Sequence, residues 1–69
     1  MAKSASEKYQ EFQELSEEYR ERFPKEEDPR NYSAPLGMNE ITRILKEADG
    51  RKIVFTEGDG EDEVFHSFA

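Results

Sequence analysis

Two short apolar runs, residues 53–55 and 64–68, flank a loop made of glycine and carboxylate residues. Between the runs the chain reads Thr-Glu-Gly-Asp-Gly-Glu-Asp-Glu. Apolar segments separated by a short glycine-containing loop are typical of a β-hairpin. We therefore predict a hairpin over residues 52–68, with a block of negative charge at its tip.

The apolar pattern also predicts how the two strands pair. A two-residue type I′ turn at residues 59–60 would place Phe55 opposite Val64. One face of the ribbon would then carry Ile53, Phe55, Val64, His66 and Phe68. A three-residue loop over residues 58–60 would scatter this set, so we favour the two-residue turn. The opposite face still holds Val54 and Phe65.

A long helix is predicted for residues 5–23. Ser4 and Glu7 have the spacing of a capping box, and no glycine or proline follows until Pro24. The apolar residues of this segment recur every three or four positions, as they do on one face of a helix. They are Tyr9, Phe12, Leu15, Tyr19 and Phe23. We call this set the aromatic stripe.

A linker and a second helix are predicted between the long helix and the hairpin. Residues 24–31 hold two prolines and five charged residues, a composition that ends a helix, so residues 24–37 are predicted to form a solvated linker. Residues 38–49 show helical spacing at Ile41, Ile44, Leu45 and Ala48. We expect this helix to be the more deeply buried of the two. The sequence thus predicts one small α+β domain over residues 1–69, with a long N-terminal helix, a linker, a short helix and a C-terminal β-hairpin.

The net charge of the chain limits the kinds of partner that it can bind. The 69 residues include 17 acidic and 10 basic ones, for a formal net charge of -7. Such a surface repels DNA, RNA and anionic membranes, and it favours basic protein surfaces. There is no cysteine, so disulfides and thiolate zinc sites are excluded. No stretch resembles a signal peptide or a membrane span, which leads us to expect a cytoplasmic protein.

Motifs for chemistry are weak. The carboxylates at the hairpin tip do not follow EF-hand spacing, because Val64 stands where that loop needs glycine. His66 is the single histidine, and its neighbour Ser67 would point to the opposite face of a strand. The loops over residues 34–37 and 58–60 contain glycine, but neither has the lysine of a phosphate-binding loop. We therefore expect a protein without enzymatic activity, metal or cofactor.

These observations predict a small acidic protein-binding module. Its sharper form is an anionic decoy, of the kind encoded by phages and mobile elements, which occupies a basic nucleic-acid-binding surface of its partner. The predicted contact residues are Tyr9, Phe12, Glu57, Asp59, Glu61, Asp62 and Glu63. One alternative is an assembly subunit that forms a homodimer through the aromatic stripe. Another is a regulator whose hairpin edge accepts a strand from its partner.

Overall fold

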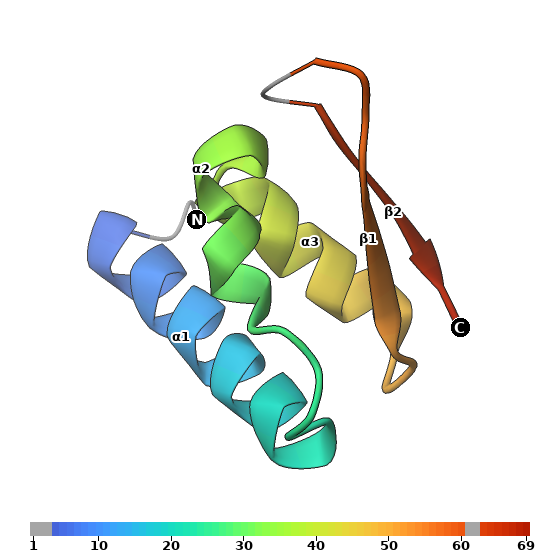
Figure 1. The fold of residues 1–69 in the computed structure, drawn as a ribbon. Coiled ribbons are helices and arrows are strands. Elements are labelled where there is room, and N and C mark those ends of the chain that lie inside the picture. The colour runs from blue at the N-terminus through green and yellow to red at the C-terminus, as the bar shows by residue number, and fades with distance from the viewer. Residues whose placement is uncertain (1–3, 61–62) are drawn as a thin grey trace.

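The computed structural model of the chain describes residues 4–60 and 63–69. It confirms the predicted α+β class, with a long N-terminal helix, short helices and an antiparallel two-strand hairpin. In chain order the elements are α1 (Ala5–Arg22), the 3₁₀ helix η1 (Pro29–Tyr32), α2 (Ser33–Leu36), α3 (Met38–Ala48), β1 (Ile53–Glu57) and β2 (Val64–Phe68). The helices group together, and the hairpin stands beside the end of α3 (Figure 1).

The limits of α1 agree with the prediction to within one residue. The Ser4 side chain accepts a hydrogen bond from the backbone N–H of Glu7 (3.3 Å) and so caps the first turn. At the other end, the N–H of Phe23 donates to the carbonyl of Tyr19 (2.8 Å). Spacings of four and three place the buried residues on one face of the helix; they are Phe12, Ser16 and Tyr19.

The connection between α1 and α3 corrects the prediction of a solvated linker. Residues 24–37 contain η1 and α2, and Pro29 is fully buried. The Asp28 side chain caps η1 by accepting a hydrogen bond from the N–H of Arg30 (2.9 Å). Proline suits the first position of a helix because its missing N–H would have no partner there. The proline that composition marks as a helix breaker therefore begins a helical turn that packs on the core.

Arg30 fastens this connection to α1. Its guanidinium donates to both carboxylate oxygens of Asp28, at 2.6 to 3.0 Å. It also donates to Gln13 (2.6 Å) and Glu17 (3.1 Å) on α1. Arg20 adds a longer contact to Asp28 (3.4 Å), whose side chain is only 11% exposed. A carboxylate with this many donors is stabilised in its charged form.

Asp28 should make stability depend on pH. Burial raises the pKa of Asp28, but the hydrogen bonds and charge of Arg30 outweigh burial and hold this pKa below its usual value. The ionised carboxylate therefore favours folding above the unfolded pKa of about 3.9. This contribution is lost as the pH falls through the lower, folded pKa. We expect Asp28→Asn to lower the free energy of unfolding by about 1–2 kcal/mol at neutral pH.

Urea denaturation at neutral pH and in acid below the folded pKa checks this expectation. The difference between Asp28→Asn and the unmodified chain should shrink in acid, because both side chains are then uncharged. Asp59→Asn is the control, since Asp59 is exposed and makes no ion pair within the described residues. A difference that stays the same at both pH values would contradict the assigned role.

The prediction that the second helix is the more deeply buried is confirmed. Five residues of α3 are at most 9% exposed, namely Ile41, Thr42, Ile44, Leu45 and Ala48. The helix ends at Asp49 and Gly50, which have φ angles of 49° and 85°. Glycine adopts this left-handed conformation without steric cost. The Arg51 guanidinium then donates to the carbonyl of Ala48 (3.0 Å), which satisfies an acceptor left open by the helix end.

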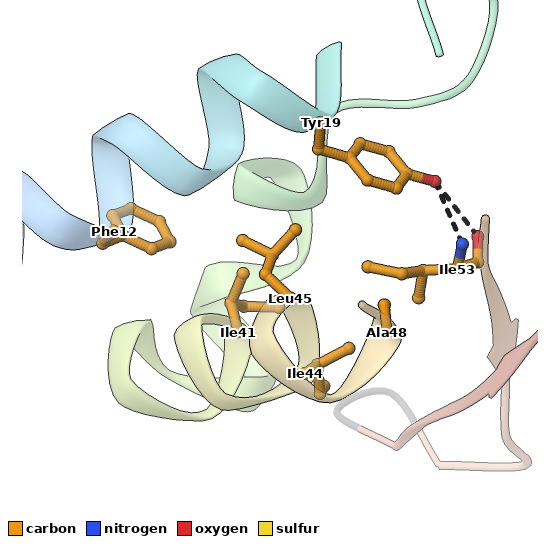
Figure 2. Packing of buried hydrophobic residues seen from close by; sticks show 7 residues of the cluster. All are labelled: Phe12, Tyr19, Ile41, Ile44, Leu45, Ala48 and Ile53. Atoms are coloured by element: carbon orange, nitrogen blue, oxygen red, sulfur yellow. Dashed lines mark hydrogen bonds between the residues drawn. The ribbon is translucent and has the colours of Figure 1, made fainter. Parts of the chain in front are cut away.

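One hydrophobic cluster joins the helices to the hairpin. Figure 2 shows its buried members, Phe12, Tyr19, Ile41, Ile44, Leu45, Ala48 and Ile53. The Tyr19 hydroxyl donates to the carbonyl of Ile53 (3.4 Å) and accepts from the N–H of the same residue (3.2 Å). This hydroxyl takes the place of a neighbouring strand at the start of β1. It therefore links the hairpin to α1.

The hairpin register corrects the prediction by two residues. Phe55 lies opposite His66 instead of Val64, β1 ends at Glu57, and β2 begins at Val64. A shift of two preserves the faces of a strand, so the predicted apolar set still shares one face. The predicted register would have placed Glu57 opposite Asp62. Like charges directly opposite one another are destabilising, and the observed register avoids this pair by placing Glu57 opposite Val64.

Ser16 offers a test of the packing between α1 and the core. Among the described residues, its buried hydroxyl has no hydrogen-bond partner, and the side chain is 0% exposed. Alanine would remove the unsatisfied hydroxyl, keep the small volume and favour the helix. We expect Ser16→Ala to raise the free energy of unfolding by about 1 kcal/mol, measured by urea denaturation. Ser6→Ala, at an exposed position of the same helix, is the control; a loss of stability in Ser16→Ala alone would show that the hydroxyl is satisfied.

Candidate functional site

The loop between the strands has a defined closure. The N–H of Gly58 donates to the carbonyl of Glu63 (2.8 Å), and the N–H of Glu63 donates to the carbonyl of Gly60 (3.2 Å). A Cβ atom at residue 58 would lie 2.8 Å from both the Cβ of Glu63 and the ring of Phe65. Only glycine fits so close an approach. The missing side chain of Gly58 therefore allows the close approach that positions Glu57 and Asp59 at the tip.

Three described carboxylates stand at the hairpin tip. Glu57, Asp59 and Glu63 are all exposed. Within residues 4–60 and 63–69, none of them forms an ion pair. The other two predicted contact residues of the tip, Glu61 and Asp62, lie outside the described residues. We call these five residues the acidic tip.

The helical part of the molecule differs, because several of its basic residues pair with neighbouring acids. Lys46 pairs with Glu11 (2.9 Å), and Lys52 pairs with Glu26 (3.1 Å). Further pairs among the described residues join Arg43 to Glu40 and Glu47, Arg30 to Glu17 and Asp28, and Arg20 to Asp28. Exposed pairs of this kind add little stability. They do cancel much of the local charge.

The net charge is concentrated in the hairpin as a result. Residues 1–52 contain twelve acidic and ten basic residues, which leaves a net charge of -2. Residues 53–69 contain five acidic residues and no lysine or arginine, which gives -5 of the total -7. Charges act over about 8 Å at physiological salt. Neighbouring carboxylates of the acidic tip therefore reinforce one another.

A further carboxylate approaches the hairpin from the connection. Glu27 accepts a hydrogen bond from the Tyr32 hydroxyl (2.8 Å), and the Tyr32 ring stacks on Phe55 of β1 at a centroid distance of 4.2 Å. The hydrogen bond to Glu27, burial, and the charges of Glu27 and Glu57 all raise the pKa of Tyr32. The negative surface therefore extends from the tip to the connection. The sequence did not predict this role for Glu27, because only the fold brings it near β1.

The ribbon also exposes apolar groups. Its outer face, made of Val54, Thr56, Phe65 and Ser67, carries no charge. Phe65 is 61% exposed and Val54 is 39% exposed. On α1, the predicted contact residue Tyr9 is 55% exposed, whereas Phe12 is 5% exposed and packs in the core. This burial removes Phe12 from the surface that a partner can reach.

The remaining candidates for chemistry are dispersed. His66 is half-buried on the inner face of β2, with its ring 5.6 Å from that of Phe68. An open groove of about 430 Å³ lies between α1 and the end of α3, and residues of both charge signs line it, among them Glu18, Arg22, Asp49 and Arg51. In the part of the chain that the structure describes, no group of three or more His, Cys, Asp or Glu residues could hold a metal ion. The hairpin therefore remains the surface with the largest excess of acidic over basic residues.

Comparison with protein-family models, with curated proteins and with solved structures finds no match to this chain. None of the described helices is both long and apolar enough to cross a membrane. Function must therefore be inferred from the surface itself. Its main features are the acidic tip, the uncharged outer face and the nearby carboxylate of Glu27.

Proposed function

We propose that this protein is a small non-enzymatic binding module whose acidic hairpin docks on a basic surface of a partner protein. The observation that carries the proposal is the net charge of -5 over residues 53–69. The described carboxylates of the tip are exposed, and residues 53–69 contain no lysine or arginine. Complementary charge steers two proteins together and disfavours wrong partners.

A more specific version of this proposal is that the partner surface otherwise binds nucleic-acid phosphates. The protein would then act as an anionic decoy, as inhibitors of phage or mobile-element origin do. Occupying the groove requires no reaction, because carboxylates compete directly with phosphates for lysine and arginine. Such a complex should form quickly and weaken as salt rises.

Capture from an extract of the source cells tests the proposal. The tagged chain is incubated at low salt and washed with buffer, heparin or high salt. We expect to retain a nucleic-acid-binding protein that heparin and high salt both displace. A variant with lysine at four positions of the tip, Asp59, Glu61, Asp62 and Glu63, should no longer retain it.

A matched variant controls for total charge. It places lysine at four exposed carboxylates of α1, namely Glu7, Glu14, Glu18 and Glu21. This variant changes the net charge by the same amount and should still retain the partner. If the tip variant captures the partner as well as the unmodified chain does, the proposal is wrong.

Self-association through the aromatic stripe is the alternative function. The exposure of Tyr9 favours it, whereas two other members of the stripe, Phe12 and Tyr19, already pack inside their own chain. On this alternative, sedimentation should show a dimer that Tyr9→Ser dissociates. A monomer at all concentrations tested would contradict it.

A further inference from the structure

The two-stranded sheet has outward-facing backbone groups whose positions follow from its ladder. In an antiparallel pair, residues that bond to the partner strand alternate with residues that face away from it. The N–H of Ala69 donates to the carbonyl of Lys52 (2.9 Å), and the N–H of Gly58 donates to the carbonyl of Glu63 (2.8 Å). The even-numbered residues of β1 therefore face β2. The odd-numbered residues of β1, and Val64, His66 and Phe68 of β2, face away from the ladder.

The two edges of the sheet are covered differently. At β1, the Tyr19 hydroxyl bonds both backbone groups of Ile53. At β2, no group in residues 4–60 or 63–69 makes a hydrogen bond to the outward N–H and C=O groups of Val64, His66 and Phe68. The C-terminal end of β2 also lies beyond β1, on the side away from α1 (Figure 1). Among the described residues, the outward groups of Phe55 and Glu57 on β1 also make no hydrogen bond, so the edge of β1 is covered only at Ile53, whereas the edge of β2 is open along its whole length.

Nothing in β2 blocks the addition of another strand. Exposed edges are usually protected by lysine, proline, a bulge or very short length. The sequence of β2 is Val-Phe-His-Ser-Phe, with no lysine and no proline, and its five residues pair with β1 without a bulge. Phe65 adds an exposed apolar side chain on the outer face. Both backbone and side chains are thus suited to an incoming strand.

Charge determines what kind of strand fits this edge. β2 begins directly after Glu63, and Glu57 pairs with its first residue, Val64. A second copy of this chain would bring the same net charge of -7, with no lysine or arginine in residues 53–69. A basic strand would instead place its cations beside the acidic tip, and its apolar residues beside Phe65.

We infer that the open edge of β2 binds an extended segment of the partner that carries lysine or arginine, and that this segment joins the sheet as a third strand. Main-chain hydrogen bonds to Val64, His66 and Phe68 supply the alignment. The acidic tip and the outer face select the side chains. This inference rests on the proposed function, because it assumes that the hairpin is the surface that meets the partner.

A pair of model peptides tests the inference. The probe is a short blocked peptide of alternating lysine and valine; the control is the same peptide with N-methyl groups on alternate amides, which keep its charge but prevent a ladder. Hydrogen exchange is followed by NMR. With the probe at about ten times its dissociation constant, exchange at Val64, His66 and Phe68 should slow about tenfold. The control should bind at least about tenfold more weakly.

The outcomes separate this inference from the proposed function. If both peptides bind equally and the three amides exchange as before, strand addition is wrong while the acidic contact stands. If neither peptide binds at low salt, the acidic contact itself fails. If the chain alone sediments as a dimer with the three amides already protected, a second copy occupies the edge and the inference is overturned.

Discussion

We expect Ile44→Ala to lower the free energy of unfolding by about 2–5 kcal/mol. Ile44 is 0% exposed and belongs to the cluster that joins α3, α1 and β1. Removing its buried methyl groups loses the favourable free energy of transferring them out of water. It also leaves a cavity that the neighbouring side chains fill only in part. Stability scales at about 0.05–0.15 kcal/mol per residue, so for a chain this short the loss is comparable to the whole stability.

Urea denaturation followed by circular dichroism measures this loss. Val54→Ala is the matched control, because it also removes methyl groups but lies on the outer face, where the side chain is 39% exposed. We expect the control to lose less than about 1 kcal/mol. Equal losses in the two variants would show that α3 does not carry the core as described.

The second large effect is expected from Tyr19→Phe. The ring stays in the core, but the N–H and C=O of Ile53 lose their partner. Leaving buried polar groups unsatisfied costs about 1–3 kcal/mol each, and we expect a total loss of about 2–3 kcal/mol. Because these bonds link the hairpin to α1, hydrogen exchange at Phe65 and Ser67 should quicken more than exchange within α3.

Tyr9→Phe is the control for this experiment. Its hydroxyl accepts a hydrogen bond from Gln13 (2.9 Å) on the exposed side of α1. Removing that bond should change the free energy of unfolding by less than about 0.5 kcal/mol. If Tyr19→Phe behaves like Tyr9→Phe, the hydroxyl does not hold the hairpin in place.

Local signals in the sequence predicted the elements well. Helical spacing and a capping serine located α1, and the burial of α3 followed from its aliphatic residues. The inward and outward faces of the ribbon followed from alternation alone, since any even shift of register preserves them. These features depend on residues that are close together in the chain.

The errors arose where distant residues decide the outcome. The observed register avoids placing Glu57 opposite Asp62. Repulsion between two carboxylates on opposite strands favours it. The linker became ordered because Arg30 and Asp28 meet side chains of α1. Composition shows neither effect.

The candidate site was also only partly predictable. The exposure of Glu57, Asp59 and Glu63 follows from the sequence, because a glycine-rich turn exposes its carboxylates. The placement of Phe12 in the core, of Glu27 beside Tyr32, and of the Tyr19 hydroxyl on β1 depends on how the helices pack. The open edge of β2 could be located only once the register was known.

On the proposed function, the charge of the hairpin, and not the total charge of the chain, binds the partner. The most direct test measures the affinity of the captured partner for three proteins by calorimetry at low and high salt: the unmodified chain, the tip variant and the α1 variant with four reversed charges. Reversing the tip should weaken binding at least about a hundredfold and remove most of the salt dependence, whereas the α1 variant should lose less than about tenfold. Equal losses in the two variants, or an unchanged affinity of the tip variant, would show that the hairpin charge does not bind the partner.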